Sequence, residues 1–296
     1  MSIRGKSINL FLMDGDPIGR IKCTLANWTG VAYKIPRTEI DKCKGRDDLT
    51  QSGVYFLFGA SEETGDAVVY IGQAGVRKNG EGILYRLQEH KRNPDKDYWT
   101  EAVVFTTSNN SFGPTEISYL ENRFCSLAIA AKRYVVKNGN DPTLGNITEE
   151  KESELEEFLD YAKIVMGTLG HKIFEPLTEK SSNADISDSV TFEIKKDDKK
   201  DGVWAKGVRT SEGFVLLKGS KLKSTLAPSL RETIKVLRTR HANKIDNNGI
   251  LLEDLLLRSP NEAANFALGY PINALTAWVT IDGKTLKEFE SNEGND

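Results

Sequence analysis

The sequence predicts an α+β protein with two domains joined by a polar linker. The chain has 296 residues, of which 39% are hydrophobic, and this length is sufficient for two domains that each bury a core. Strand-like runs and helical patterns alternate up to residue 178, and a similar succession restarts after residue 201. Residues 179–201 combine few bulky apolar side chains with a mixed run of charges, which is typical of a linker.

The composition argues against several classes of protein. Three cysteines, Cys23, Cys43 and Cys125, are too few and too scattered for a disulfide framework or a zinc knuckle, and three histidines cannot form a histidine-rich metal cage. The sequence shows no signal peptide and no run of about 18 apolar residues, so we expect a cytoplasmic protein without membrane association. The formal net charge of −3 gives no sign of a globally basic nucleic-acid-binding protein.

Residues 1–48 are expected to form an N-terminal hairpin and helix appendage. Alternating side chains predict a strand over residues 7–13, and a return strand over 21–28 follows the turn sequence Asp-Gly-Asp-Pro. Pro36 favours a short helix over residues 37–43. No side chain in this appendage suggests chemistry, so its expected role is to pack against the next domain.

Residues 49–178 are predicted to form the first globular domain. Apolar residues at steps of three and four, with capping residues at the ends, indicate three helices in this region. The expected strands are 53–58, 67–71 and 103–106, and the expected helices are 83–92, 114–133 and the segment between Thr148 and Gly170.

Residues 202–290 are predicted to form a smaller, basic α+β domain. It begins with a hairpin signal, and Ser259 followed by Pro260 and Glu262 is a strong helix start. The expected elements are strands 203–208 and 214–217, helices at 229–240 and after Ser259, and a terminal hairpin of 278–281 with 284–286. The last six residues are expected to be disordered.

The candidate catalytic side chains lie between residues 53 and 121. Two tyrosines on neighbouring strands precede a glycine-rich loop, a helix carrying an arginine and a histidine four residues apart, and a glutamate on the next helix. In phosphodiester hydrolysis the carboxylate can bind a metal ion, the arginine can neutralise the phosphate, and a phenol can orient or deprotonate water with help from a base or cation. These side chains are Tyr55, Tyr70, Arg86, His90 and Glu121.

The order of these motifs resembles the GIY-YIG nuclease superfamily over about residues 50–145. The motifs read GVY at 53–55, YIG at 70–72, R-x-x-x-H at 86–90 and a glutamate within YLENRF at 119–124. The first motif has Val54 where the superfamily name has isoleucine. The resemblance implies a nuclease core in which helices flank a three-stranded antiparallel sheet.

The resemblance also implies individual roles. Tyr55 and Tyr70 match the tyrosines of the two motifs. Arg86 matches the helix arginine, and Glu121 matches the glutamate that binds the divalent ion, Mg²⁺ or Mn²⁺. His90 matches a histidine that only some members carry four residues beyond the arginine.

Three assignments stay open at this stage. Arg77 competes with Arg86 because the loop before the helix is expanded, and we prefer Arg86 because it lies within an apolar-periodic helix. The asparagine that closes the core in the superfamily matches either Asn138 or Asn140. Either tyrosine could activate water.

Charge is unevenly distributed along the chain. Residues 145–180 carry nine acidic residues and four lysines, a balance of −5, whereas residues 191–244 carry fourteen Lys or Arg and six Asp or Glu, a balance of +8. Basic residues interleaved with aromatics are typical of phosphate contacts and base stacking. The expected DNA-binding residues are Lys206, Arg209, Lys218, Lys221 and Lys223, and the interleaved aromatics are Phe192, Trp204 and Phe214. The C-terminal pattern of SPNEAA, Trp278 and DGK resembles a small domain of unassigned function that is often fused to GIY-YIG nucleases.

The sequence therefore predicts a Mg²⁺-dependent endonuclease that hydrolyses DNA, with the C-terminal domain supplying affinity or target choice. An alternative is a catalytically inactive, nuclease-like module that binds nucleic acid in a regulatory role. A third hypothesis is an RNA-directed or structure-specific nuclease of a repair or defence system. Because one site cuts one strand, double-strand cleavage implies a homodimer or two successive nicks.

Overall fold

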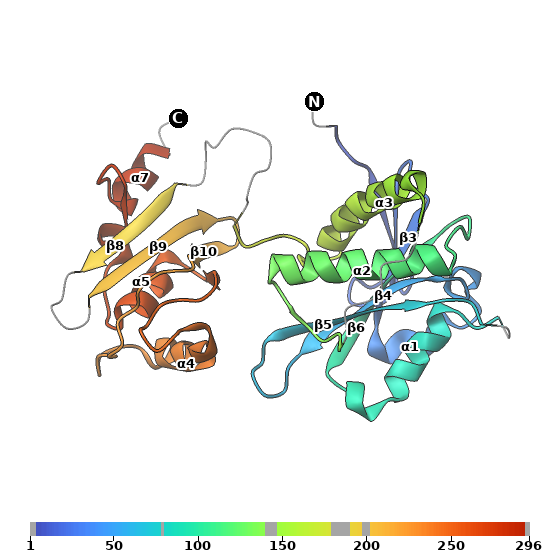
Figure 1. Cartoon of the computed structure of the whole chain (residues 1–296), viewed down its shortest axis with the longest axis horizontal. Helices are drawn as coiled ribbons and strands as arrows, with labels where there is room; N and C mark the ends of the chain where they lie inside the picture. The colour runs from blue at the N-terminus through green and yellow to red at the C-terminus, as the bar shows by residue number, and fades with distance from the viewer. Residues whose placement is uncertain (1–3, 78–79, 140–146, 179–189, 197–201, 294–296) are drawn as a thin grey trace. The chain divides into compact units, whose positions relative to one another are not determined.

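A computed structural model describes residues 4–77, 80–139, 147–178, 190–196 and 202–293 of the chain (Figure 1). The chain divides into two compact units, Met1–Pro176 and Leu177–Asp296, which we call the N-terminal and C-terminal units. Both units combine a β-sheet with helices, so the α+β class is confirmed. No described helix is long and apolar enough to cross a membrane.

The N-terminal unit contains a seven-stranded mixed sheet with the order β1-β2-β3-β6-β4-β5-β7. Neighbouring strands are antiparallel except β5 and β7, which are parallel. The strands are β1 (Ile8–Leu12), β2 (Ile21–Leu25), β3 (Gly30–Pro36), β4 (Gly53–Ala60), β5 (Ala67–Ala74), β6 (Trp99–Thr107) and β7 (Val135–Val136). The α-helices are α1 (Ile83–Arg92), α2 (Pro114–Ala131) and α3 (Glu149–Thr168), and the short 3₁₀ segments are η1 (Arg37–Cys43), η2 (Asp47–Leu49) and η3 (Pro94–Lys96).

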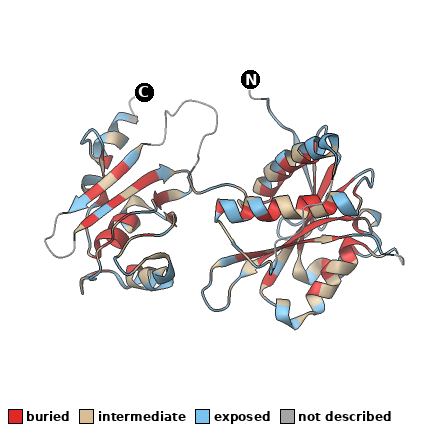
Figure 2. Cartoon of the chain, in the orientation of Figure 1, coloured by how far each residue is buried: buried red, intermediate tan, exposed pale blue. Residues whose placement is uncertain are grey.

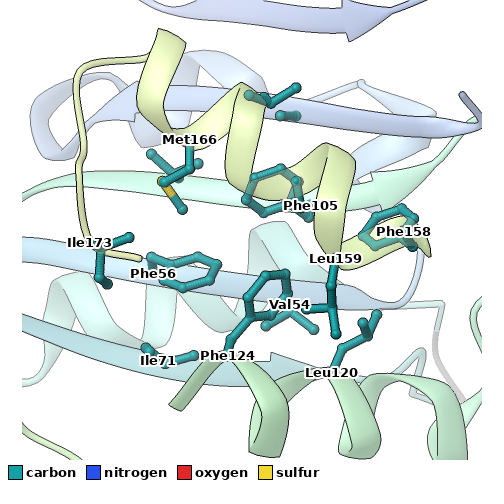
Figure 3. Close-up of a cluster of buried hydrophobic side chains, with 14 of the residues drawn as sticks. Val54, Phe56, Ile71, Phe105, Leu120, Phe124, Phe158, Leu159, Met166 and Ile173 are labelled. Atoms are coloured by element: carbon teal, nitrogen blue, oxygen red, sulfur yellow. The ribbon is translucent and has the colours of Figure 1, made fainter. Parts of the chain in front are cut away.

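Strand β4 lies inside the sheet and buries side chains on both of its faces (Figure 2). Successive strand residues point to opposite faces, so Val54 and Phe56 face one core while Tyr55 and Leu57 face another. Helices α2 and α3 cover the first face, where Phe56 and Phe124 pack edge to face at a centroid distance of 5.1 Å (Figure 3). Helix α1 and η1 cover the second face, and the candidate site is built there.

The predicted three-stranded sheet accounts only for the centre of this larger sheet. Strands β6, β4 and β5 are adjacent as expected, but β3 was not predicted and pairs with β6 from Gly30↔Thr107 to Pro36↔Glu101. Residues 30–36 are buried on both faces, so they lack the alternation that identifies an amphipathic strand. The N-terminal appendage is thus an integral part of the sheet, and the segment predicted as a helix at 37–43 is a 3₁₀ helix.

The C-terminal unit contains a five-stranded sheet in the order β11-β10-β9-β8-β12, in which all neighbours are antiparallel. The strands are β8 (Thr191–Lys196), β9 (Val203–Thr210), β10 (Gly213–Leu216), β11 (Leu255–Leu257) and β12 (Val279–Thr280). The helices are α4 (Glu232–Arg240), α5 (Pro260–Leu268), α6 (Ala274–Ala277), α7 (Leu286–Glu293) and the 3₁₀ segment η4 (Ala242–Lys244). Ser259 caps α5 as expected, because its hydroxyl accepts from the Glu262 amide at 3.2 Å.

Several C-terminal predictions need correction. Strand β8 lies inside the predicted linker and pairs with β9 over its whole length. The expected terminal hairpin is present as a short turn, in which Val279 bridges Thr285 and the Leu286 amide donates to the Trp278 carbonyl at 2.9 Å. Its first arm, β12, also pairs with β8. Residues 286–293 form helix α7, which was not predicted and which includes the start of the segment expected to be disordered. Phe192 and Phe214, which the sequence grouped with basic residues, are buried in the core of this unit.

Asn138 closes the free edge of β5 beyond the two residues of β7. Its amide Nδ2 donates to the Ile71 carbonyl at 2.7 Å, and its Oδ1 accepts from the Ile71 amide at 3.1 Å. One side chain therefore supplies both hydrogen bonds that a neighbouring strand would make. Asn140 lies outside the described residues.

We expect Asn138→Ala to lower the free energy of unfolding by about 1–3 kcal/mol, because both backbone groups of Ile71 would lose their partner. Urea unfolding of the full chain measures this loss. Asn109→Ala in an exposed turn is the matched control and should change stability by less than about 0.5 kcal/mol. Equal stability of the two variants would show that Asn138 does not hold this edge.

Candidate active site

The register of β4 and β5 brings the two motif tyrosines together. Tyr55 pairs directly with Gly72, and Tyr70 lies two residues before Gly72 on the same face of β5. The two phenol rings have centroids 6.2 Å apart. Tyr55 is buried at 1% exposure, whereas Tyr70 is half-buried.

Gly72 makes this arrangement sterically feasible. A methyl group at Gly72 would overlap the hydroxyl of Tyr55 and would come within 2.9 Å of Cε1 of Tyr70. The phenol of Tyr55 therefore lies directly over the backbone of β5. The glycine of the second motif has a physical reason in this chain, which is the close approach of an aromatic ring to a neighbouring strand.

Helix α1 places His90 and Arg86 over these tyrosines. The hydroxyl oxygen of Tyr55 lies 2.7 Å from Nε2 of His90, and the His90 ring centroid is 5.4 Å from that of Tyr70. His90 is buried at 3% exposure, one turn beyond Arg86, whose side chain keeps 39% of its surface exposed. The helix thus presents a buried imidazole and, closer to solvent, a guanidinium.

Burial sets the protonation states of the Tyr55–His90 pair. Burial and, to a smaller extent, the positive charges of Lys96 and Arg86 lower the pKa of His90 to about 3, so the imidazole is neutral at pH 7. Burial also raises the pKa of Tyr55 well above its usual range, and neighbouring Tyr70 adds to this effect. The site therefore holds a neutral phenol against a neutral imidazole, and Nε2 can accept the phenolic proton in the tautomer that is protonated on Nδ1.

Both arginines that competed in the sequence contact one carboxylate. The Glu89 carboxylate forms ion pairs with the guanidinium of Arg86 at 2.8 Å and with that of Arg77 at 2.9 Å. The Arg77 guanidinium also lies 3.7 Å from the carboxylate of Glu81. Arg86 is the arginine whose charge acts on Tyr55, His90 and Glu121. The geometry therefore favours Arg86 as the guanidinium of the site, with Glu89 orienting it.

Glu121 reaches the site from the other face of the sheet. It lies on α2, and hydrogen bonding from Gln73 on β5 favours its charged form, as does the nearby charge of Arg86. Burial outweighs both effects and raises the pKa of the Glu121 carboxyl. Glu121 is thus a partly desolvated carboxylate beside the strand that carries Tyr70.

Sequence reasoning did not identify Lys96 or Gln73 as part of this group. The Lys96 ammonium lies 3.4 Å from the centroid of the Tyr70 ring, and burial, reinforced by Arg86, lowers its pKa to about 8. Lys96 lies in η3, in a polar segment that resembled an ordinary surface turn. Gln73 directly follows the YIG motif, and the strand alternation that places it on the face of α2 could have identified it.

A divalent ion fits this group only as an ion shared between Glu121, water and a substrate phosphate. Among the described residues, no three His, Cys, Asp or Glu side chains gather closely enough to hold an ion by themselves. Mg²⁺ in phosphoryl-transfer sites is often held by one or two carboxylates together with water and substrate phosphate. A partly desolvated Glu121 fits such a shared site, because a nearby cation would stabilise its charged form.

A cavity lies elsewhere in the N-terminal unit. It measures about 210 Å³ and is lined by the turn before β3 and by parts of α2 and α3, including Trp28, Phe158 and Tyr161. None of the five predicted catalytic side chains lines it. We place the candidate site by the chemistry of its side chains, because a nucleic-acid backbone binds at an exposed surface and needs no enclosed cavity.

The five predicted DNA-binding residues do not share one surface. Lys206 and Lys221 lie beside Trp204 on one face of the C-terminal sheet. Arg209 faces the opposite side and approaches Glu290 of α7 at 3.5 Å. The two remaining residues lie in loops, with the Lys218 amide donating to Asp254 and the Lys223 ammonium 5.7 Å from the Tyr270 ring.

We expect Gly72→Ala to destabilise the protein by about 1–3 kcal/mol, because the added methyl group must displace the ring of Tyr55. Chemical unfolding provides the measurement. Gly75→Ala is the matched control, since its new methyl group would meet only Cδ1 of Ile117 at an ordinary 3.8 Å. If both substitutions cost the same, the close contact over Gly72 has no energetic importance.

The depressed pKa of His90 predicts a pH dependence of stability. Between its unfolded pKa near 6.5 and its folded pKa of about 3, the unfolded chain binds more protons, so stability is complete above about pH 6.5 and falls as pH decreases through this window. Comparing unfolding free energies at pH 7.5 and 5.0 should show a smaller loss for His90→Gln than for the natural chain. Parallel losses would mean that His90 titrates normally.

Comparison with known proteins identifies one segment of the chain. Residues 196–290 match the family model of a domain of unknown function, DUF4357. The matched segment lies in the C-terminal unit and agrees with the expected small domain of unassigned function. No curated protein and no solved structure matches the chain.

Proposed function

We propose that the protein is a Mg²⁺-dependent endonuclease that hydrolyses phosphodiester bonds of DNA at the group formed by Tyr55, Tyr70, Arg86, His90 and Glu121. The observation that carries the proposal is the 2.7 Å contact between Tyr55 Oη and His90 Nε2. It joins a phenol to a neutral base beside a guanidinium, within the motif order of GIY-YIG nucleases. Packing alone does not require a phenol, an imidazole and a guanidinium to meet at this position.

In the proposed reaction, the oxygen of a water molecule attacks the phosphorus and forms a new P–O bond. The bond between phosphorus and one ester oxygen breaks, and that oxygen leaves as an alcohol after it takes up a proton from solvent. Tyr55 accepts a proton from the attacking water while its own phenolic proton passes to Nε2 of His90. Burial and the nearby cations disfavour the imidazolium of His90, so this relay requires the negative charge of the bound phosphate to favour it while the phenolic proton is transferred.

Tyr70, Arg86 and Glu121 have separate parts in the proposal. Tyr70 orients the water, because it is the more exposed of the two tyrosines and lies beside both Tyr55 and His90. Arg86 neutralises the charge that develops on the phosphate oxygens. Glu121 would hold the divalent ion, which supplies Lewis-acid polarisation of the phosphate when it is bound.

Plasmid nicking in the presence of Mg²⁺ tests this function. Tyr55→Phe, Arg86→Ala and Glu121→Gln are each expected to lower the nicking rate about 10²- to 10³-fold, because each removes a group that stabilises the transition state or transfers its proton. A single site per chain predicts nicked circles as the first product.

Two matched controls sharpen this test. Arg77→Ala and Glu116→Gln remove similar charges from the preceding loop and from the start of α2, so they should keep nicking within about threefold of the natural rate. Full activity of Glu121→Gln would remove the metal assignment. Retention of DNA in gel shifts with no cutting under any divalent ion would replace the proposal with an inactive, nucleic-acid-binding module.

A further inference from the structure

Trp204 is unusual among the tryptophans of this chain. All four lie in the described residues; Trp99 and Trp278 are fully buried, Trp28 is partly buried, and Trp204 keeps 43% of its surface exposed. A tryptophan side chain has one of the largest apolar surfaces of any residue, so its exposure forgoes a large gain in burial. The exposed indole therefore invites a functional explanation.

The sheet register surrounds Trp204 with lysines. Trp204 pairs directly with Lys195 of β8 on one side and forms a bridge with Lys221 on the other. Directly paired residues point to the same face of a sheet, with Cβ atoms about 5 Å apart. Lys206 lies two residues further along β9, and its ammonium is 4.9 Å from the indole centroid. The register thus flanks one exposed aromatic ring with Lys195 and Lys221, whose ammonium donates to the Asn248 carbonyl, while Lys206 contacts the ring.

This face of the sheet is distinct from the hydrophobic core of the C-terminal unit. Val203 and Ala205, which alternate with Trp204, point into that core, where helix α5 packs against β9, β10 and β11 (Figure 1). Trp204 and its lysines therefore point away from α5. The lysines are also organised, because Glu193 contacts Lys195 at 2.7 Å and Lys206 at 3.0 Å.

We propose that this face binds single-stranded DNA, with Trp204 stacking on an unpaired base and Lys195, Lys206 and Lys221 contacting the flanking phosphates. A flat exposed indole recognises the face of a base, and that face is accessible in a single strand but hidden in a duplex. The positive border complements the negative backbone. The inference rests on the proposed action on DNA but does not depend on cleavage.

Glu193 provides a second test, in which a substitution should strengthen DNA binding and not weaken it. Its carboxylate neutralises two of the three lysines and would lie close to the bound phosphates. We therefore expect Glu193→Gln to strengthen binding several-fold, whereas Lys206→Gln should weaken it and reduce the slope of log affinity against log salt by about 0.7. A purely structural cluster would lose stability in both variants without this change of sign.

The experiment measures binding of the full chain to fluorescein-labelled dT15 in EDTA, where no cutting occurs. The natural chain should bind dT15 more tightly than a 15-base-pair duplex, and Trp204→Ala should weaken dT15 binding about 5- to 150-fold. Unlabelled dT15 should quench tryptophan fluorescence in the natural chain but not in Trp204→Phe. Because Trp204→Phe keeps an aromatic ring, this variant separates loss of the indole from unfolding of the domain. Lys235→Gln on α4 is the charge-matched control and should bind as the natural chain does.

Each other outcome overturns a defined claim. Unchanged affinity of a folded Trp204→Ala variant, quenching that persists in Trp204→Phe, or equal binding of the duplex would exclude the stacking role. Tighter binding of rU15 than of dT15 would identify RNA as the partner and overturn the assignment to DNA. If the natural chain shows Trp204-dependent binding but does not nick plasmid, the proposed nuclease is refuted and this inference stands. If it nicks plasmid but binding does not depend on Trp204, this inference is refuted and the proposed nuclease stands.

Discussion

The candidate site depends on one close contact, in which the phenol of Tyr55 lies on the backbone of Gly72. Because Gly72 has no side chain, the ring of Tyr55 can lie over its backbone, where its hydroxyl meets His90 of α1 at 2.7 Å. The contact in turn requires β5 to hold its position, although it lies near the edge of the sheet. Asn138 contributes here by hydrogen-bonding both backbone groups of Ile71, the residue that precedes Gly72.

The electrostatics of the site follow from its placement between a helix and a sheet. His90 is neutral because burial and two nearby cations all disfavour the imidazolium. Partial desolvation raises the pKa of the Glu121 carboxyl, and the charge of Arg86 only partly compensates for this effect. The site thus stores a neutral base and an incompletely stabilised carboxylate, two groups that respond when a phosphate or a metal ion arrives.

The sequence was most informative where local patterns suffice. The order of Tyr55, Tyr70, Arg86 and Glu121 along strands and helices could be read directly, and the structure brings these elements together. Strand β3 could not be predicted from its pattern, because burial on both faces removes the alternation. Helix α7 was not predicted, because its short sequence has only two large apolar side chains, Leu286 and Phe289, and ends in a polar tail. The contact of Lys96 with Tyr70 depends on tertiary proximity, and the pairing of Trp204 with Lys195 and Lys221 depends on cross-strand register. A single sequence encodes neither locally, although the basic and aromatic composition around Trp204 was apparent from it.

The pairing of β3 with β6 has a consequence for how the protein can be divided. Seven successive residue pairs join these strands, from Gly30↔Thr107 to Pro36↔Glu101. A fragment that starts at residue 49 would contain every proposed catalytic side chain but would leave one edge of β6 without its partner. Such an exposed edge is a template for pairing with other chains, so this fragment would tend to aggregate. Strand β3 thus covers the edge of β6 that another chain could otherwise pair with.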